Sequence, residues 1–223
     1  PDIVNIVELA KEFHFKEIEI MTSGQVLADE RFTKKLINSG VNSFSLPLYS
    51  DIAQIHDSVV GVKGSYLKVL KGVENVLSNK GKVFVHSNLL KQNIDYLKKL
   101  EGFVKNVLGL PFVILPVRPK SSNLSYEDLV PSYNDIVMKL RGVNSLMAFP
   151  LCIIKQVQEN ILKDETEIAD SMKLYVLDQK FFKPQKCRKC ANRLKCVGIF
   201  KEYGQMYGVE ALKPFIGNGK KIG

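Results

Sequence analysis

The sequence lacks any long apolar segment, since no run approaches the ~20 residues that a membrane-spanning helix needs. It opens without the charged and then apolar leader of a secreted protein, and it contains only three histidines and four cysteines. A Ser-His-Asp pattern, a P-loop and a Gly-x-Gly-x-x-Gly fingerprint are absent as well. These absences argue against a membrane protein and a secreted disulfide scaffold. They also mean that no common hydrolase or nucleotide-binding motif identifies the function.

The residues that are present are typical of a globular chain with unevenly distributed charge. The 223 residues include 45% hydrophobic and 25% charged side chains, enough for one large domain. The formal net charge is +9: residues 1–180 carry 22 basic and 21 acidic side chains, and residues 181–223 carry 10 and 2. An excess of positive charge favours an anionic partner. Because residues 1–180 are nearly neutral, the charge argues against a nucleic-acid partner that contacts the whole chain.

Short apolar segments alternate with helical patterns over the first 150 residues. Five segments are typical of strands: Glu17–Met21, Val41–Leu48, Lys82–Asn88, Pro111–Val117 and Asn144–Phe149. Apolar residues with helical spacing lie between them, over Asp29–Asn38, Tyr66–Leu77, Asn93–Leu108 and residues 126–140. This alternation predicts a parallel sheet, either doubly wound or part of a β/α barrel, with functional residues at the strand ends. Further on, we expect a helix over Ile153–Leu162 and a short strand over Lys173–Leu177.

Three cysteines lie close together in the basic C-terminal segment. Cys187 and Cys190 are separated by two residues, and Cys196 follows after five more, so that all three sulfurs can turn toward one metal ion or cluster. A fourth ligand is still needed, and Cys152, with 34 residues between it and Cys187, is the only other cysteine. The sequence therefore predicts a four-cysteine metal site. Four thiolates suit zinc and an iron–sulfur cluster alike, so the spacing leaves both open.

Simpler interpretations of the cysteines remain. A two-residue spacing is also found in redox disulfides, although a third cysteine nearby is unusual there. Cys152 alone is typical of a small buried apolar side chain, and its assignment as a ligand depends on ligand counting. Cationic neighbours are expected to favour thiolates and to offset the negative charge of a cluster. These neighbours are Lys186, Arg188, Lys189, Arg193 and Lys195.

Taken in order, several short motifs resemble those of the radical S-adenosylmethionine (SAM) enzymes. The matching residues are Thr22-Ser23-Gly24, Asp29, Phe32, Leu36, Gly40-Val41, Ser45-Leu46, His56-Asp57, Gly64-Ser65-Tyr66, Val83–Asn93 and Cys196-Val197-Gly198. Each motif is weak singly, but their order and spacing together are fairly specific. The resemblance covers almost the whole body and the cysteine-rich tail.

The resemblance implies an α/β fold: a partial (β/α)6 TIM-like barrel over residues 1–150 that lacks its first strands, with a Cys-rich extension over residues 151–223. The family's Cys-x3-Cys-x2-Cys and Gly-Gly-Glu-Pro motifs are absent, and Thr-Ser-Gly replaces the commoner Thr-Asn-Gly. Because the first residue is Pro1 and not methionine, we expect a truncated chain, with a degenerate relative that never binds SAM as the alternative. As written, the chain is not expected to cleave SAM by itself. Phe200 stands where two-cluster members have another cysteine, which indicates one auxiliary cluster.

For the intact enzyme, the resemblance implies reductive cleavage of SAM to a 5′-deoxyadenosyl radical, which takes hydrogen from a small-molecule or peptide substrate. Electrons would come from a reductant such as ferredoxin or flavodoxin, and a second 4Fe–4S cluster would bind SAM. Ser45, Thr22 and His86 become candidate SAM contacts, with core hydrogen bonding or capping as the alternative. The four cysteines become ligands of an auxiliary 4Fe–4S cluster. Free thiols and oxygen-sensitive clusters indicate a reducing cytoplasm.

A rival hypothesis makes the tail a zinc-binding, nucleic-acid-interacting module. Such a module needs aromatic side chains beside its basic residues, so that bases can stack on them. Phe181, Phe182, Tyr203 and Tyr207 are the candidates. The neutral body and the family resemblance count against this hypothesis, and the ratio of iron to zinc would separate the two.

Overall fold

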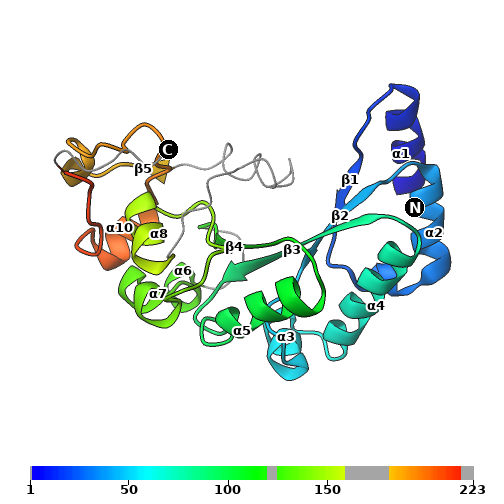
Figure 1. Cartoon of the computed structure of the whole chain (residues 1–223), viewed down its shortest axis with the longest axis horizontal. Helices are drawn as coiled ribbons and strands as arrows, with labels where there is room; N and C mark the ends of the chain where they lie inside the picture. The colour runs from blue at the N-terminus through cyan, green and yellow to red at the C-terminus, as the bar shows by residue number, and fades with distance from the viewer. Residues whose placement is uncertain (1, 120–124, 159–180, 217–223) are drawn as a thin grey trace. The chain divides into compact units, whose positions relative to one another are not determined.

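The computed structural model describes residues 2–119, 125–158 and 181–216 and shows a mixed α/β protein (Figure 1). Four strands form one sheet in the order β1 (Glu19–Met21), β2 (Ser43–Pro47), β3 (Lys82–Leu89) and β4 (Phe112–Pro116). The strands are parallel: Met21 lies opposite Ser45, and Pro47 lies opposite His86. Four of the five expected strands and their parallel direction are therefore confirmed.

The fifth expected strand, Asn144–Phe149, is wrong. This segment makes only an isolated parallel bridge, between Ile114 and Leu146. Two backbone hydrogen bonds hold the bridge, from Ile114 N to Ser145 O at 2.7 Å and from Met147 N to Ile114 O at 3.0 Å. Directly afterwards Ala148 has a φ of 60°, which takes the chain out of the extended conformation. Among the described residues no closed barrel is formed.

The helices follow the predicted pattern in part. Helix α2 (Glu30–Ser39) begins where expected, because the Asp29 carboxylate accepts a hydrogen bond from Phe32 N at 3.1 Å, and α4 (Ser65–Ser78) covers its predicted segment. The predicted helix over residues 126–140 is two helices separated around Pro131. Residues beyond 158 of the expected helix Ile153–Leu162, and the whole expected strand Lys173–Leu177, lie outside the described residues.

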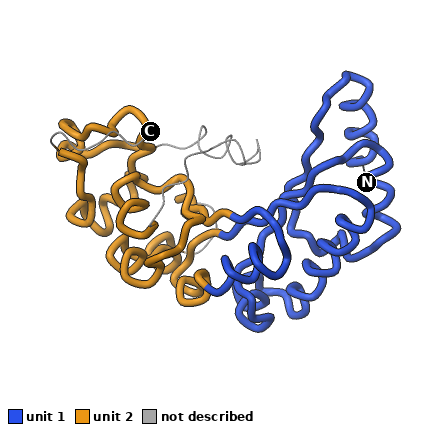
Figure 2. The backbone as a smooth tube through the Cα atoms, viewed as in Figure 1, with its two compact units in different colours: residues 1–87, 99–112 blue, residues 88–98, 113–223 orange. Residues whose placement is uncertain are grey.

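The chain divides into two compact units (Figure 2). Unit 1 contains residues 1–87 and 99–112. Helix α4 packs against α2, α3 and η1 there, and α1 packs against α2. Its helical elements are α1 (Ile3–Glu12), η1 (Gln25–Ala28), α2, α3 (Ala53–Val60), α4, most of α5 (Leu97–Gly102) and the π-helical turn η2 (Phe103–Val107).

Unit 2 contains residues 88–98 and 113–223. Helix α7 packs against α8, and Tyr133 of α7 stacks on Tyr203 of α10 with ring centroids 4.0 Å apart. Strands β5 and β6 pair in antiparallel fashion, with Phe181 stacked on Phe200. The helices and short strands named here, together with α6 and η4 of the same unit, have these bounds: α6 (Tyr126–Leu129), α7 (Tyr133–Lys139), α8 (Leu151–Val157), β5 (Phe181–Phe182), η4 (Gln185–Cys187), β6 (Ile199–Phe200) and α10 (Lys201–Tyr207).

None of the helices in the described ranges combines the length and the apolar character needed to span a membrane.

Candidate metal centre

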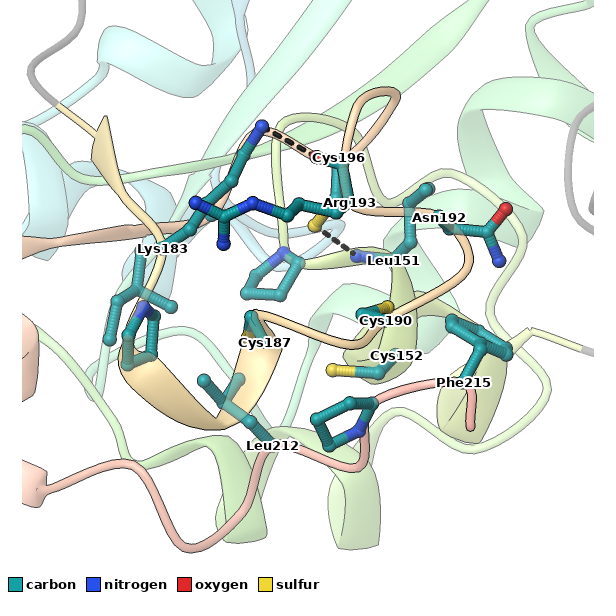
Figure 3. Close-up of a pocket in the computed structure, with 15 residues that line it drawn as sticks. Leu151, Cys152, Lys183, Cys187, Cys190, Asn192, Arg193, Cys196, Leu212 and Phe215 are labelled. Atoms are coloured by element: carbon teal, nitrogen blue, oxygen red, sulfur yellow. Dashed lines mark hydrogen bonds between the residues drawn. The ribbon is translucent and has the colours of Figure 1, made fainter. Parts of the chain in front are cut away.

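All four cysteines line one small pocket of unit 2, with about 20 Å³ of free space (Figure 3). Cys152 comes from α8, and Cys187, Cys190 and Cys196 come from the segment that joins β5 to β6. All four are free thiols. The structure therefore brings together side chains that stand far apart in the sequence. The rest of the lining is a mixture of apolar and cationic residues: Pro150, Leu151, Lys183, Pro184, Asn192, Arg193, Gly198, Ile199, Leu212, Pro214 and Phe215.

Successive tight turns bring three of the thiols to this pocket. Cys187 N donates to Pro184 O at 2.9 Å, and Cys190 N donates to Cys187 O at 3.1 Å. The chain then turns again, with a hydrogen bond of 3.0 Å from Cys196 N to Asn192 O. Turns of this kind return the chain toward the same side every three or four residues. The two-residue spacing of Cys187 and Cys190 matches that geometry, and Cys196 is reached by the separate turn that starts at Asn192.

Gly198 allows the segment to leave the pocket and pair with β5. Its φ is 92°, a conformation that favours glycine. A Cβ atom at this position would also collide with the carbonyl oxygen of Phe182. The motif Cys196-Val197-Gly198 thus combines a candidate ligand with the residue that lets β5 and β6 approach.

Cys152 lies in the first turn of α8, where it is 8% exposed. Burial, together with the neighbouring Cys196 and Cys187 thiols, raises the pKa of Cys152 to about 11. Leu151, the residue before it, donates its backbone N–H to Cys196 Sγ at 3.4 Å (Figure 3). The start of α8 therefore supplies both a thiol and a hydrogen bond to a second thiol.

At Cys187, the cationic neighbours have a smaller effect on the thiol than the sequence predicts. Burial and the nearby Cys196 and Cys190 raise the pKa of Cys187, while Lys186 and Arg193 act in the opposite direction. The net effect of burial, neighbouring thiols and cations is a raised pKa for Cys187. In the absence of metal, Cys152 and Cys187 therefore favour the protonated form, because repulsion from the neighbouring thiols adds to the cost of burying charge.

The thiols share the pocket without converging on one point. Across residues 2–119, 125–158 and 181–216, no three His, Cys, Asp or Glu side chains form a group that could hold a metal ion as they stand. Protonated thiols have no mutual attraction, and metal binding displaces their protons. Four thiols are nevertheless the donor set that zinc and iron–sulfur clusters use.

Asn192 is a feature of this pocket that the sequence pattern does not single out. Its side chain is 2% exposed, and its Nδ2 has no hydrogen-bond acceptor among the described residues. A buried donor without an acceptor costs about 1–3 kcal/mol. Asparagine is common in turns for local reasons, so only the tertiary structure distinguishes this one.

The three candidate SAM contacts lie in unit 1, on or directly after successive parallel strands: Thr22 follows β1, Ser45 is the middle residue of β2, and His86 lies within β3. Ser45 of β2 is fully buried, and its Oγ is 3.1 Å from Nδ1 of His86 on β3. Thr22 follows β1, donates its N–H to Ser45 O at 3.2 Å, and accepts a hydrogen bond at its own Oγ1. Burial lowers the pKa of His86 to about 4, so its imidazole is neutral at physiological pH. The structure thus joins all three residues through two hydrogen bonds.

The motif residues His56-Asp57 of α3 and Gly64-Ser65-Tyr66 at the start of α4 are joined by hydrogen bonds in unit 1. The Asp57 carboxylate accepts hydrogen bonds from Gly64 N at 2.6 Å and Tyr66 N at 2.8 Å, at the start of α4. The buried His56 Nε2 lies 3.3 Å from Ser65 Oγ. These contacts tie α3 to α4 and give the motif a structural role.

The aromatic side chains of the tail are mostly committed to packing. Phe181 and Tyr203 each stack on another ring, with centroids 4.5 and 4.0 Å apart, and Tyr203 is 3% exposed. The hydroxyl of Tyr207 donates to Val130 O at 2.8 Å. Only Phe182, at 37%, is exposed among the four candidates for base stacking.

No family model matches this chain, and no curated protein is similar enough to it to count as a relative.

Proposed function

We propose that the chain is part of a radical SAM enzyme in which Cys152, Cys187, Cys190 and Cys196 hold one auxiliary 4Fe–4S cluster. The observation that carries this proposal is that four free thiols from two separate segments line a single pocket. Cysteines that served only as packing would have no reason to gather in this way, and only Cys152 of the four is buried. The motif order described above links the pocket to this enzyme class.

The residues around the thiols fit such a cluster. Cluster thiolates and sulfides are stabilised by N–H donors and by an apolar shell that excludes water. Leu151 N already donates to Cys196 Sγ, and the buried Nδ2 of Asn192 is a further donor at the same pocket. Ile199 and Leu212, which are 1% and 3% exposed, provide apolar lining.

An iron–sulfur cluster bound here would supply one-electron chemistry. The chain's own contribution is to provide four thiolates, to release their protons when the metal binds, and to keep the site dry. Because burial raises the pKa of Cys152 and Cys187, and because thiols release their protons when they bind metal, loading is expected to be strongly pH-dependent, as it is for other thiolate sites. The lysines and arginines at the pocket offset part of the negative charge that loading creates.

In unit 1 we propose that Thr22, Ser45 and His86 belong to the SAM-binding edge of a partial β/α barrel. This is supported by the hydrogen bonds that join the three residues across adjacent parallel strands, and by the position of Thr22 directly after the carboxyl end of β1, where ligands bind in β/α folds. The hydroxyl of Ser45 is buried against His86, so its role is to orient the imidazole. Thr22 and His86 are the residues that would contact the ligand. The reaction would be reductive cleavage of SAM and hydrogen abstraction from a small-molecule or peptide substrate.

A zinc ion is the second candidate occupant of the four-cysteine pocket. It is favoured by the small free space of about 20 Å³ and by the suitability of four thiolates for tetrahedral zinc. In that case the pocket would be structural, and the chain would be a degenerate scaffold or a zinc-dependent binding protein.

Metal analysis of the full chain, reconstituted anaerobically with iron and sulfide and in parallel with zinc, tests the proposal. We expect about four iron and four sulfide per chain, with the visible absorption of a 4Fe–4S cluster. Replacing Cys152 or Cys196 with alanine should remove most of the iron. Stoichiometric zinc with no iron would overturn the cluster assignment.

A matched control separates ligand loss from disturbed packing. Ile153 is the neighbour of Cys152 on α8 and is fully buried. The variant Ile153→Val removes one methylene from the same helix, so it should retain the iron content of the unaltered chain. If it loses iron as Cys152→Ala does, packing of α8, and not ligation, explains the loss.

A further inference from the structure

The loop that carries the cysteines exposes one apolar side chain almost completely. Leu194, between Cys190 and Cys196, is 96% exposed, whereas Asn192 two residues earlier is 2% exposed. This exposure is not the fraying of a loose tip. Arg193 N donates to Cys190 O at 3.1 Å, and Lys183 Nζ donates to Arg193 O at 2.6 Å. The backbone next to Leu194 is therefore held in place with the leucine facing solvent.

Additional contacts fix the loop from other sides. Ala191 N donates to Phe215 O at 2.9 Å, and Lys186 Nζ donates to Val209 O at 2.8 Å. A leucine presented on an ordered loop loses little conformational freedom when a partner covers it, which favours binding. The conformation of the loop is thus preorganised for contact with a partner.

Cations flank this leucine along the chain. Between residues 181 and 216 the chain has eight basic and two acidic side chains. Four exposed cations lie on the loop itself, two before Leu194 in the sequence and two flanking it: Arg188, Lys189, Arg193 and Lys195. An exposed apolar side chain on a loop that carries exposed cations suits protein docking, and the cations select an acidic partner.

We propose that the loop Cys187–Cys196 is the docking surface for an acidic one-electron carrier protein, with Leu194 as the central contact. A nucleic acid is disfavoured because the loop has no aromatic residue on which bases could stack, and because Phe181 and Tyr203 are packed elsewhere. The choice of an electron carrier rests on the proposed function: Cys190 and Cys196 flank Leu194, so a docked protein would lie beside the proposed cluster. One electron would pass from the reduced carrier to that cluster.

Binding of two purified acidic carriers, a flavodoxin and a 2Fe–2S ferredoxin, to the anaerobically reconstituted full chain tests the surface. Calorimetry at about 50 and 300 mM salt should show binding of at least one carrier that weakens as salt rises. The variant Leu194→Asp, and the double variant Arg188→Glu with Lys189→Glu, should each weaken that binding by about tenfold or more.

Matched substitutions in unit 1 provide the controls. Leu67 on α4 is 67% exposed, and Lys34 and Lys35 are exposed on α2. Leu67→Asp and the double variant Lys34→Glu with Lys35→Glu should change carrier binding by less than about twofold. Absence of binding by both carriers, or equal loss in the loop and control variants, would overturn the proposal.

Two further measurements separate the possible failures. If phosphatidylserine vesicles or a poly(U) RNA bind through Leu194 and Arg188 while neither carrier does, the loop serves a different anionic partner and the proposal is wrong. Iron and sulfide content is measured for every variant. Full cluster content with carrier binding unaffected by the loop variants overturns the docking surface alone. A chain that holds zinc and still binds a carrier through the loop retains the docking surface but overturns the cluster assignment.

Discussion

At the scale of single residues, His86 links stability to pH. Its imidazole is 8% exposed beside Ser45 Oγ, and burial lowers its pKa to about 4 from 6.5. The unfolded chain therefore binds a proton more readily between these two values. We expect the full free energy of unfolding above about pH 6.5, and a loss of roughly 3 kcal/mol as the pH falls toward 4.

Urea denaturation between pH 7.5 and 4.5 measures this dependence. The variant His86→Asn keeps a polar partner for Ser45 but has no titratable group, so its free energy of unfolding should fall less over the same range. His56, whose pKa burial also lowers, remains in both proteins and leaves a residual slope. Identical slopes for the two proteins would show that His86 does not titrate as described.

The backbone N–H of Leu151 is a second residue with a specific expected effect. Leu151 is the first residue of α8, a position where proline fits the helix but has no N–H. Leu151→Pro therefore removes the hydrogen bond to Cys196 Sγ and leaves the helix in place. Because N–H donors at cluster sulfurs raise the reduction potential, we expect a more negative midpoint potential in the loaded protein.

Redox titration followed by electron paramagnetic resonance checks this expectation. Leu151→Ala is the matched control, since it shortens the side chain and keeps the N–H donor. A shift of equal size in both variants would assign the effect to the side chain and not to the hydrogen bond.

At the scale of secondary structure elements, the packing of α4 on η1 depends on Gly72. A Cβ at Gly72 would lie 2.8 Å from Gly24 O and 2.9 Å from Leu27 Cβ, closer than real contacts allow. Gly72→Ala must therefore separate the two elements, and we expect it to lower the free energy of unfolding by about 1–3 kcal/mol. Gly102, in helical conformation with its nearest atom at 3.9 Å, is the control.

Thermal and urea denaturation of both glycine variants provide the comparison. Gly102→Ala should leave the free energy of unfolding unchanged or raise it by up to about 1 kcal/mol, because alanine favours the helix. A destabilisation of Gly102→Ala equal to that of Gly72→Ala would contradict the close-approach explanation.

The helices and strands also show which local sequence signals are sufficient to predict an element. Helix α2 was predictable because its cap, Asp29, and its terminating Gly40 are adjacent in sequence. Helix α3 (Ala53–Val60) is missed, because it has only eight residues and its N-cap, Ile52, offers no capping side chain. The short β5 and β6 are missed as well, since two-residue strands exist only through their pairing with each other.

At the scale of the whole molecule, metal removal should affect one unit. All residues that line the cysteine pocket belong to unit 2. Because metal binding and local folding are coupled, chelation after reconstitution is expected to increase amide hydrogen exchange in α8 and in residues 183–215. Strand β2 and helix α4 of unit 1 should keep their protection.

Hydrogen exchange followed by mass spectrometry, with and without chelator, makes this measurement. The chain with Cys187→Ala and Cys190→Ala is the control, since it should show the exchange pattern of the chelated protein before any chelator is added. A uniform rise in exchange across both units would contradict confinement of the effect to unit 2.

The sequence by itself determined four parallel strands, the helices with strong caps, and the four cysteines as a candidate ligand set, because periodicity and spacing are local properties. Tertiary structure alone decided that Cys152 shares a pocket with the other three, that Ser45 faces His86, and that Leu194 is exposed while Asn192 is buried. Burial and long-range contacts depend on where distant segments meet. No spacing rule within one segment contains that information.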